Sequence, residues 1–81
     1  MSAAVQAFLD MLAAERGAAV NTLAAYRRDL EGAEEAVGDL ADASRTDVAK
    51  LAGEWVTLAP STVARKSSAL RQFFGFAMDE G

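Results

Sequence analysis

Hydrophobic residues recur at spacings of three and four in four separate segments of the chain, which is the spacing of an α-helix with one buried side. No window alternates with period two, so we expect no β-strand. The pattern predicts an all-α, compact four-helix bundle that forms one domain over residues 1–81. We place its helices at about residues 3–16, 21–37, 45–55 and 60–78.

The first and third helices are predicted from their apolar stripes and from the residues at their ends. Gly17 is expected to end the first helix, whose buried stripe is Val5, Phe8, Leu9 and Leu12. The third helix opens with Ser44 and Asp47, three residues apart, which is the spacing of a capping box. We expect the third helix to bury Val48, Leu51, Ala52 and, at its end, Trp55.

The second helix is predicted to begin at Asn21, whose side chain can cap the free amides of a first turn, and to stop at Gly38. Arg28 lies on its outward side near the small residue Ala25, so a ligand could approach the backbone closely. The acid Asp29 also allows a surface helix with local ion pairs. The expected apolar face is Leu23, Tyr26, Leu30, Ala33 and Val37.

The fourth helix starts near Pro60, which a first turn tolerates, and has two unlike sides. Val63, Leu70 and Phe74 form a narrow apolar stripe that we expect to face the core, while Phe76 is expected to be exposed. Opposite this stripe lie Ser61, Arg65, Ser68 and Gln72, and at its edges lie Lys66 and Arg71. The core predicted for the whole bundle is Phe8, Leu12, Leu23, Tyr26, Leu30, Leu51, Leu70 and Phe74.

Composition is typical of one small helical domain. Eighty-one residues are enough for one core, and 52% hydrophobic residues with one proline favour helices. No apolar run approaches the roughly 20 residues that span a bilayer, and the absence of cysteine excludes disulfides and thiolate metal sites. We therefore expect a cytoplasmic domain with no membrane contact, no metal and no cofactor.

Charge is distributed unevenly along the chain. No aspartate or glutamate occurs from Trp55 to Met78, and this window carries +3. Since the whole chain carries −4, the remainder carries −7. Serine hydroxyls and arginine without a neutralising acid suit a surface that contacts phosphates and base edges, although periodicity alone favours a solvated helix face. Acidic residues must then lie away from this surface for DNA to bind.

Two fragments carry a resemblance to a known family. "FLDMLAAERG…NTLAAYRRDL", followed after a spacer by "STVARKSSALRQFFGFAMDEG", resembles the amino-terminal core-binding domain of tyrosine recombinases of the bacterial XerC/XerD type. The resemblance covers nearly the whole chain. It implies a SAM-like four-helix bundle that forms half of a clamp around double-stranded DNA during DNA recombination, with the second and fourth helices over the major groove.

The resemblance also implies which residues contact DNA. Arg65 is the strongest single candidate, and Lys66 and Arg71 are second-rank because they flank the apolar stripe. The candidates are Thr22 and Arg28 on the second helix and Ser61, Thr62, Arg65, Ser68 and Gln72 on the fourth. Other recombinase subunits are implied as partners, and the isolated domain is expected to be monomeric.

No catalytic residue is expected in this chain. Tyrosine recombinases cleave DNA with a tyrosine assisted by residues of a separate carboxy-terminal domain, which we expect to be absent here. Histidine is absent, and Tyr26 falls in an apolar stripe, where a packing role is favoured over that of a nucleophile. Trp55 is likewise expected to pack between helices. Two other classes stay open, namely a small helix-turn-helix protein and a helical protein-interaction module.

Overall fold

The computed structural model describes residues 1–80 and has four α-helices and two short 3-10 helices, with no strand in this range. All four helices predicted from the sequence are confirmed, in order and to within two residues at each end. Their bounds are α1 (Ala3–Glu15), α2 (Val20–Val37), α3 (Arg45–Glu54) and α4 (Pro60–Glu80), with η1 (Leu40–Asp42) and η2 (Trp55–Thr57) between them.

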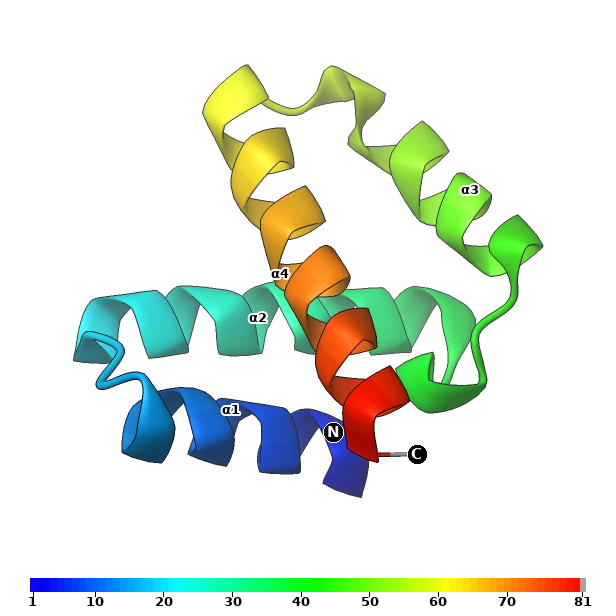
Figure 1. The fold of residues 1–81 in the computed structure, drawn as a ribbon. Helices are drawn as coiled ribbons and strands as arrows, with labels where there is room; N and C mark the ends of the chain where they lie inside the picture. Colours follow the sequence, from blue (N-terminus) through cyan, green and yellow to red (C-terminus); the bar gives the residue numbers. More distant parts are fainter. Residues whose placement is uncertain (81) are drawn as a thin grey trace.

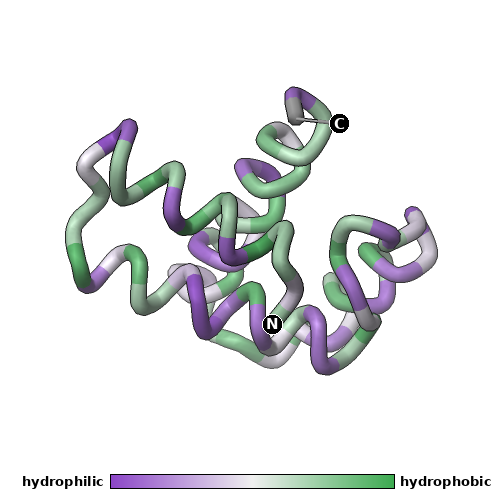
Figure 2. Tube along the Cα trace, turned by 90° about the horizontal axis from the view of Figure 1, so that it is seen from below, coloured by the Kyte–Doolittle hydropathy of each residue, from purple (hydrophilic) through white to green (hydrophobic). Residues whose placement is uncertain are grey.

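The four helices are not all parallel to one another, because α4 crosses α1 and α2 (Figure 1). α1 and α2 lie side by side in opposite directions (Figure 1). α3 contacts α2 and η2, and it stands beside the amino-terminal half of α4. Hydrophobic and hydrophilic stretches alternate along every helix trace (Figure 2). In residues 1–80, no helix is long and apolar enough to span a bilayer.

The core lies where α1, α2 and α4 meet. All four residues of the predicted stripe in α1 are buried, and Phe8 meets the Phe73 ring edge-on with 5.8 Å between centroids. Most of the predicted core is confirmed, while Leu23, Tyr26 and Phe74 are only partly buried at its margin. The buried hydrophobic residues are Val5, Phe8, Leu9, Leu12, Leu30, Ala33, Leu40, Leu51, Ala69, Leu70 and Phe73.

The buried side of α4 differs from the predicted one. Ala69 and Phe73 are fully buried beside Leu70, whereas Val63 and Phe74 are half-buried. Adjacent residues are about 100° apart around a helix, so the centre of the buried side is rotated by roughly 70° from that of the predicted stripe. The rotation arises because α4 packs across α1 and α2 and leaves its other side toward α3.

The same packing corrects two further expectations. Phe76 is half-buried, because its ring lies 5.7 Å from that of Phe8. Val48 and Ala52, predicted to be buried in α3, are exposed. Both residues line a groove of 270 Å³ between α3 and α4.

Helix ends follow the predicted chemistry except at the start of α2. Ser44 and Asp47 form the predicted capping box, and Gly38 ends α2 with a positive φ of 85°. α2, however, begins at Val20, after Ala19, and no side chain caps it. Asn21 therefore lies inside the first turn, and its predicted capping role is wrong.

The acidic connection between α2 and α3 contains a core residue that the sequence pattern did not reveal. Leu40, in η1, is fully buried. Glu34, near the end of α2, accepts hydrogen bonds from the backbone amides of Leu40 and Ser2, each 2.9 Å long. Burial raises the pKa of the Glu34 carboxyl, but these hydrogen bonds outweigh burial and the pKa lies below its usual value. Glu34 thus ties the start of α1 to η1.

Candidate nucleic-acid interface

A buried carboxylate lies at the crossing of α2 and α4. Asp29 is 4% exposed and is the only buried polar residue among residues 1–79. Arg65 grips it with two hydrogen bonds, from Nε to Oδ2 at 2.8 Å and from Nη2 to Oδ1 at 2.9 Å. Lys66 Nζ donates to the same Oδ1 at 3.1 Å. Two cations of α4 therefore share one acid of α2, and the cluster has a net charge of +1.

Ionisation of the cluster follows from its geometry. Burial raises the pKa of the Asp29 carboxyl, but the hydrogen bonds from Arg65 and Lys66 outweigh burial and hold the pKa below its usual value. The same pairing raises the pKa of Arg65. Lys66 also lies over the ring of Trp55, 5.8 Å from its centroid. Asp29 is therefore ionised and Arg65 is charged at neutral pH.

A second polar contact joins the same two helices. Gln72 Nε2 donates to the Tyr26 hydroxyl at 3.2 Å and to Ser68 Oγ at 3.0 Å, and the two hydroxyl oxygens are 3.5 Å apart. All three residues are half-buried. Tyr26 thus has the packing surroundings that the sequence pattern predicts for it.

The polar side predicted for α4 therefore does not point straight away from the bundle. Arg65, Ser68 and Gln72 all contact α2, because the core side of α4 is rotated toward Phe73. The premise that Arg65 points away from the rest of the fold is wrong. Its side chain is still 41% exposed, so one edge of the guanidinium reaches solvent.

The rotation brings a different side of α4 outward. Arg71 is exposed and, among the side chains that the structure describes, has no acidic partner within 4 Å. Small exposed residues lie on the same side, at helical spacing from it: Ala64, Ser67 and Gly75. The sequence analysis did not single out these small residues. Their spacing of three, four and four along α4 is the signal that could have found them.

The remaining candidate residues are spread over the two helices. Thr22 and Arg28 are exposed on α2, and Arg28 has no ion pair with any side chain in the described part of the chain. On α4, Ser61 is exposed and Thr62 is half-buried. The structure thus brings Arg65, Lys66, Ser68 and Gln72 together at the helix crossing and leaves the exposed candidates around it.

Acidic residues collect elsewhere. Glu31, Glu34 and Glu35 line a hollow with Met1, and Glu34 is directed to α1 and η1. Asp39 accepts a hydrogen bond from the amide of Ala41 in η1. Glu34 is therefore directed away from the exposed side of α4.

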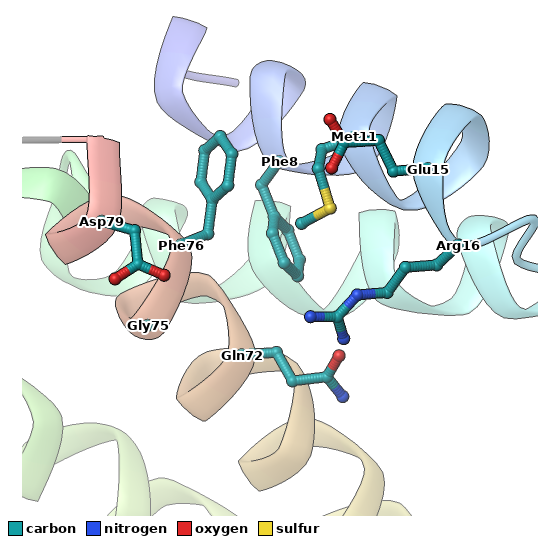
Figure 3. Close-up of a pocket in the computed structure, with 8 residues that line it drawn as sticks. All are labelled: Phe8, Met11, Glu15, Arg16, Gln72, Gly75, Phe76 and Asp79. Carbon is teal, nitrogen blue, oxygen red and sulfur yellow. The ribbon is translucent and has the colours of Figure 1, made fainter.

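A hollow of 350 Å³ lies between α1 and the carboxy-terminal half of α4 (Figure 3). Its wall contains the rings of Phe8 and Phe76, and its rim carries both signs of charge, with Arg16 near Gln72 and Asp79 farther along α4. Among residues 1–80, no group of three or more metal-ligating side chains occurs here or elsewhere.

Comparisons with known proteins agree with the fold. The family model described as "Phage integrase, N-terminal SAM-like domain" matches residues 5–81. The chain is 69% identical over 80 residues to the tyrosine recombinase XerC of Erythrobacter litoralis, a match covering 99% of this chain and 26% of the relative. It is 49% identical over 90 residues to the tyrosine recombinase XerD of Rhizobium meliloti, covering 100% of this chain and 28% of the relative.

A third relative, the tyrosine recombinase XerD of Brucella abortus, is 47% identical over 88 residues, covering 99% of this chain and 28% of the relative. The chain thus spans about a quarter of the length of these relatives. No solved structure gives a match. The chain belongs to the phage integrase N-terminal SAM-like domain family and is an amino-terminal domain of the XerC/XerD tyrosine recombinase type.

Proposed function

We propose that this domain binds duplex DNA for a site-specific tyrosine recombinase, with α2 and α4 laid against the major groove. The outward side of α4 carries the proposal, because it holds Arg71 among small residues in a stretch without acids. The major groove of B-DNA is about 12 Å wide and admits an α-helix. Small side chains let the helix backbone come close, while arginine supplies the charge that phosphates attract.

The helix crossing supports the proposal because polar residues of both helices contact one another there. The Asp29 cluster leaves a net charge of +1, and the exposed Thr22 and Arg28 of α2 lie on the helix that α4 crosses. Ser61 and the half-buried Thr62 add hydroxyl groups at the start of α4. Hydroxyl groups and arginines are the side chains that commonly contact phosphates.

The net charge of −4 weakens binding at long range. At physiological salt the Debye length is roughly 8 Å, so the electric field of the acids near α1 and η1 is largely screened at greater distances. We expect the isolated domain to bind weakly, at the weaker end of the roughly 10⁻⁴ to 10⁻⁶ M range of non-specific association. Within the whole recombinase, cleavage and most of the affinity would come from other parts of the enzyme.

A helix-turn-helix protein is less well supported. The connection from Gly38 to Ser44 contains η1 and a buried leucine, whereas a helix-turn-helix unit needs a tight corner before its recognition helix. A protein contact is favoured by the groove of 270 Å³ between α3 and α4, whose lining is mostly apolar but includes Ser67 and Arg71 of the side of α4 assigned to DNA. DNA titration separates this function from the proposed one, because a groove that binds only protein predicts no response to DNA.

Replacing Arg71 by alanine should weaken duplex binding without loss of fold, because the side chain is exposed. A lost phosphate contact would weaken all sequences alike and lower the salt slope by about one unit. A lost base contact would cost about 1–3 kcal/mol on one sequence only. Affinity should be measured calorimetrically on two unrelated duplexes at several salt concentrations.

Arg45→Ala is the matched control, since it removes one exposed arginine at the start of α3, outside the residues of α2 and α4 assigned to DNA. Its expected effect is a small loss from net charge alone. Equal losses for the two variants, or no response to DNA in the parent domain, would contradict the assignment of this side of α4.

A further inference from the structure

Asp29 is an unfavourable residue for a DNA-binding surface. Its negative charge opposes that of the phosphates, and burying a carboxylate costs free energy that an ion pair only partly returns. An apolar residue could join α2 to α4 with neither disadvantage. Asp29 instead fixes the orientation of Arg65 and Lys66 of α4, because it accepts three hydrogen bonds from these two side chains.

The geometry leaves one specific edge of Arg65 available. A guanidinium has five N–H donors, and Asp29 takes one on Nε and one on Nη2. The three donors that remain are on Nη1 and Nη2, at the tip of a side chain that is 41% exposed. Two parallel donors can still face outward, as a fork that matches two acceptor oxygens or the O6 and N7 of guanine.

Lys66 is the second cation that pairs with Asp29. It donates to the Oδ1 atom that Arg65 also contacts, and it lies over the Trp55 ring. Its side chain is 20% exposed, half the exposure of Arg65. Lys66 therefore holds the carboxylate in place, while Arg65 keeps an edge in solvent.

We propose that Asp29 is a positioning residue for DNA binding, which holds Arg65 so that the free edge of its guanidinium meets paired acceptors on duplex DNA. This inference rests on the proposed function and deepens it. An arginine fixed before DNA arrives loses less side-chain freedom on binding than a free one. The benefit is an increase in affinity that outweighs the repulsion of the carboxylate.

The test compares Asp29→Asn with Glu35→Gln in calorimetric titrations of the domain with duplex DNA. Both changes remove one negative charge, and Glu35 is exposed on the same helix. Charge alone predicts that both variants bind slightly more tightly. Positioning predicts that Asp29→Asn binds about 3- to 10-fold more weakly, while Glu35→Gln does not.

Arg65→Ala is then made in both backgrounds. It should weaken binding in the parent domain and change it by less than about 2-fold in Asp29→Asn, because the arginine is no longer held there. Loss on two unrelated duplexes would indicate a phosphate as the acceptor, and loss on one duplex a base edge. Circular dichroism at the titration temperature checks that each variant is folded.

Arg65→Lys provides a second route if Asp29→Asn does not fold. Lysine keeps the charge and can pair with Asp29, but its ammonium has no planar fork for two parallel hydrogen bonds, so binding should fall clearly below that of the parent. The inference is overturned if Arg65→Lys binds like the parent, if Asp29→Asn behaves like Glu35→Gln, or if Arg65→Ala has equal effects in both backgrounds. If the parent domain does not bind DNA at all, the proposed function fails as well.

Discussion

Phe73→Ala should destabilise the domain by about 3–5 kcal/mol, which is a large part of the stability of a domain this small. The Phe73 side chain is fully buried and packs edge-on against Phe8, so its removal leaves a cavity between α4 and α1. Urea unfolding followed by circular dichroism at 222 nm measures the loss.

Phe74→Ala is the matched control, because it removes the same side chain one position along the helix. Phe74 is half-buried beside the groove between α3 and α4, so its loss should cost clearly less. The reverse order would mean that the core side of α4 is the Val63, Leu70 and Phe74 stripe predicted from the sequence, and that the packing described above is wrong.

Leu40→Ala should cost about 2–5 kcal/mol, although the residue belongs to an acidic connection between helices. Leu40 is the first residue of η1 and its side chain is fully buried, while its backbone amide donates a hydrogen bond to Glu34. Thermal and urea unfolding of the variant measure the effect. We expect η1 to detach from α2 and the start of α3 to lose its anchor.

Leu58→Ala provides the comparison, since Leu58 is also a leucine in a connection but is 38% exposed. Its loss should cost less than about 1 kcal/mol, in the range of ordinary surface changes. If the two variants are equally stable, Leu40 is not part of the core.

Local features of the fold were predictable from the sequence because they depend on nearby residues. The stripe of α1 repeats at helical spacing, and the capping box at Ser44 and Asp47 is a contact over three residues. The glycine stops after α1 and α2 have the same origin, because Gly17 and Gly38 both adopt positive φ. Element order and type therefore followed from pattern alone.

The orientation of α4 depends on distant contacts, and for this reason the sequence pattern misplaced it. This helix has 21 residues with apolar side chains at several angles, so two buried sides were possible. The crossing with α1 and α2 selects Ala69 and Phe73. A helical wheel of α4 by itself contains no information on which neighbour it crosses.

The contacts of the candidate site could not be predicted from the sequence for the same reason, because they join residues that are distant along the chain. The sequence pattern suggests only local ion pairs for Asp29, but its partners Arg65 and Lys66 lie 36 and 37 residues away. Exposed positions such as Thr22, Arg28 and Ser61 were predictable, because they lie opposite or beyond the apolar faces. Leu40 was not, since one leucine among acids has no periodic neighbours.

Amide shifts of the ¹⁵N-labelled domain during addition of a short duplex test the central claim most directly. DNA bound across α2 and α4 predicts shifts concentrated at Thr22 and Arg28 and on the outward side of α4 from Ser61 to Gly75, with α3 changed only where it lines the groove beside Arg71. Weak binding is no obstacle, because shifts report association in the millimolar range. Shifts confined to α1 and α3, or no shift at millimolar duplex and low salt, would contradict the assignment of α2 and α4 to DNA.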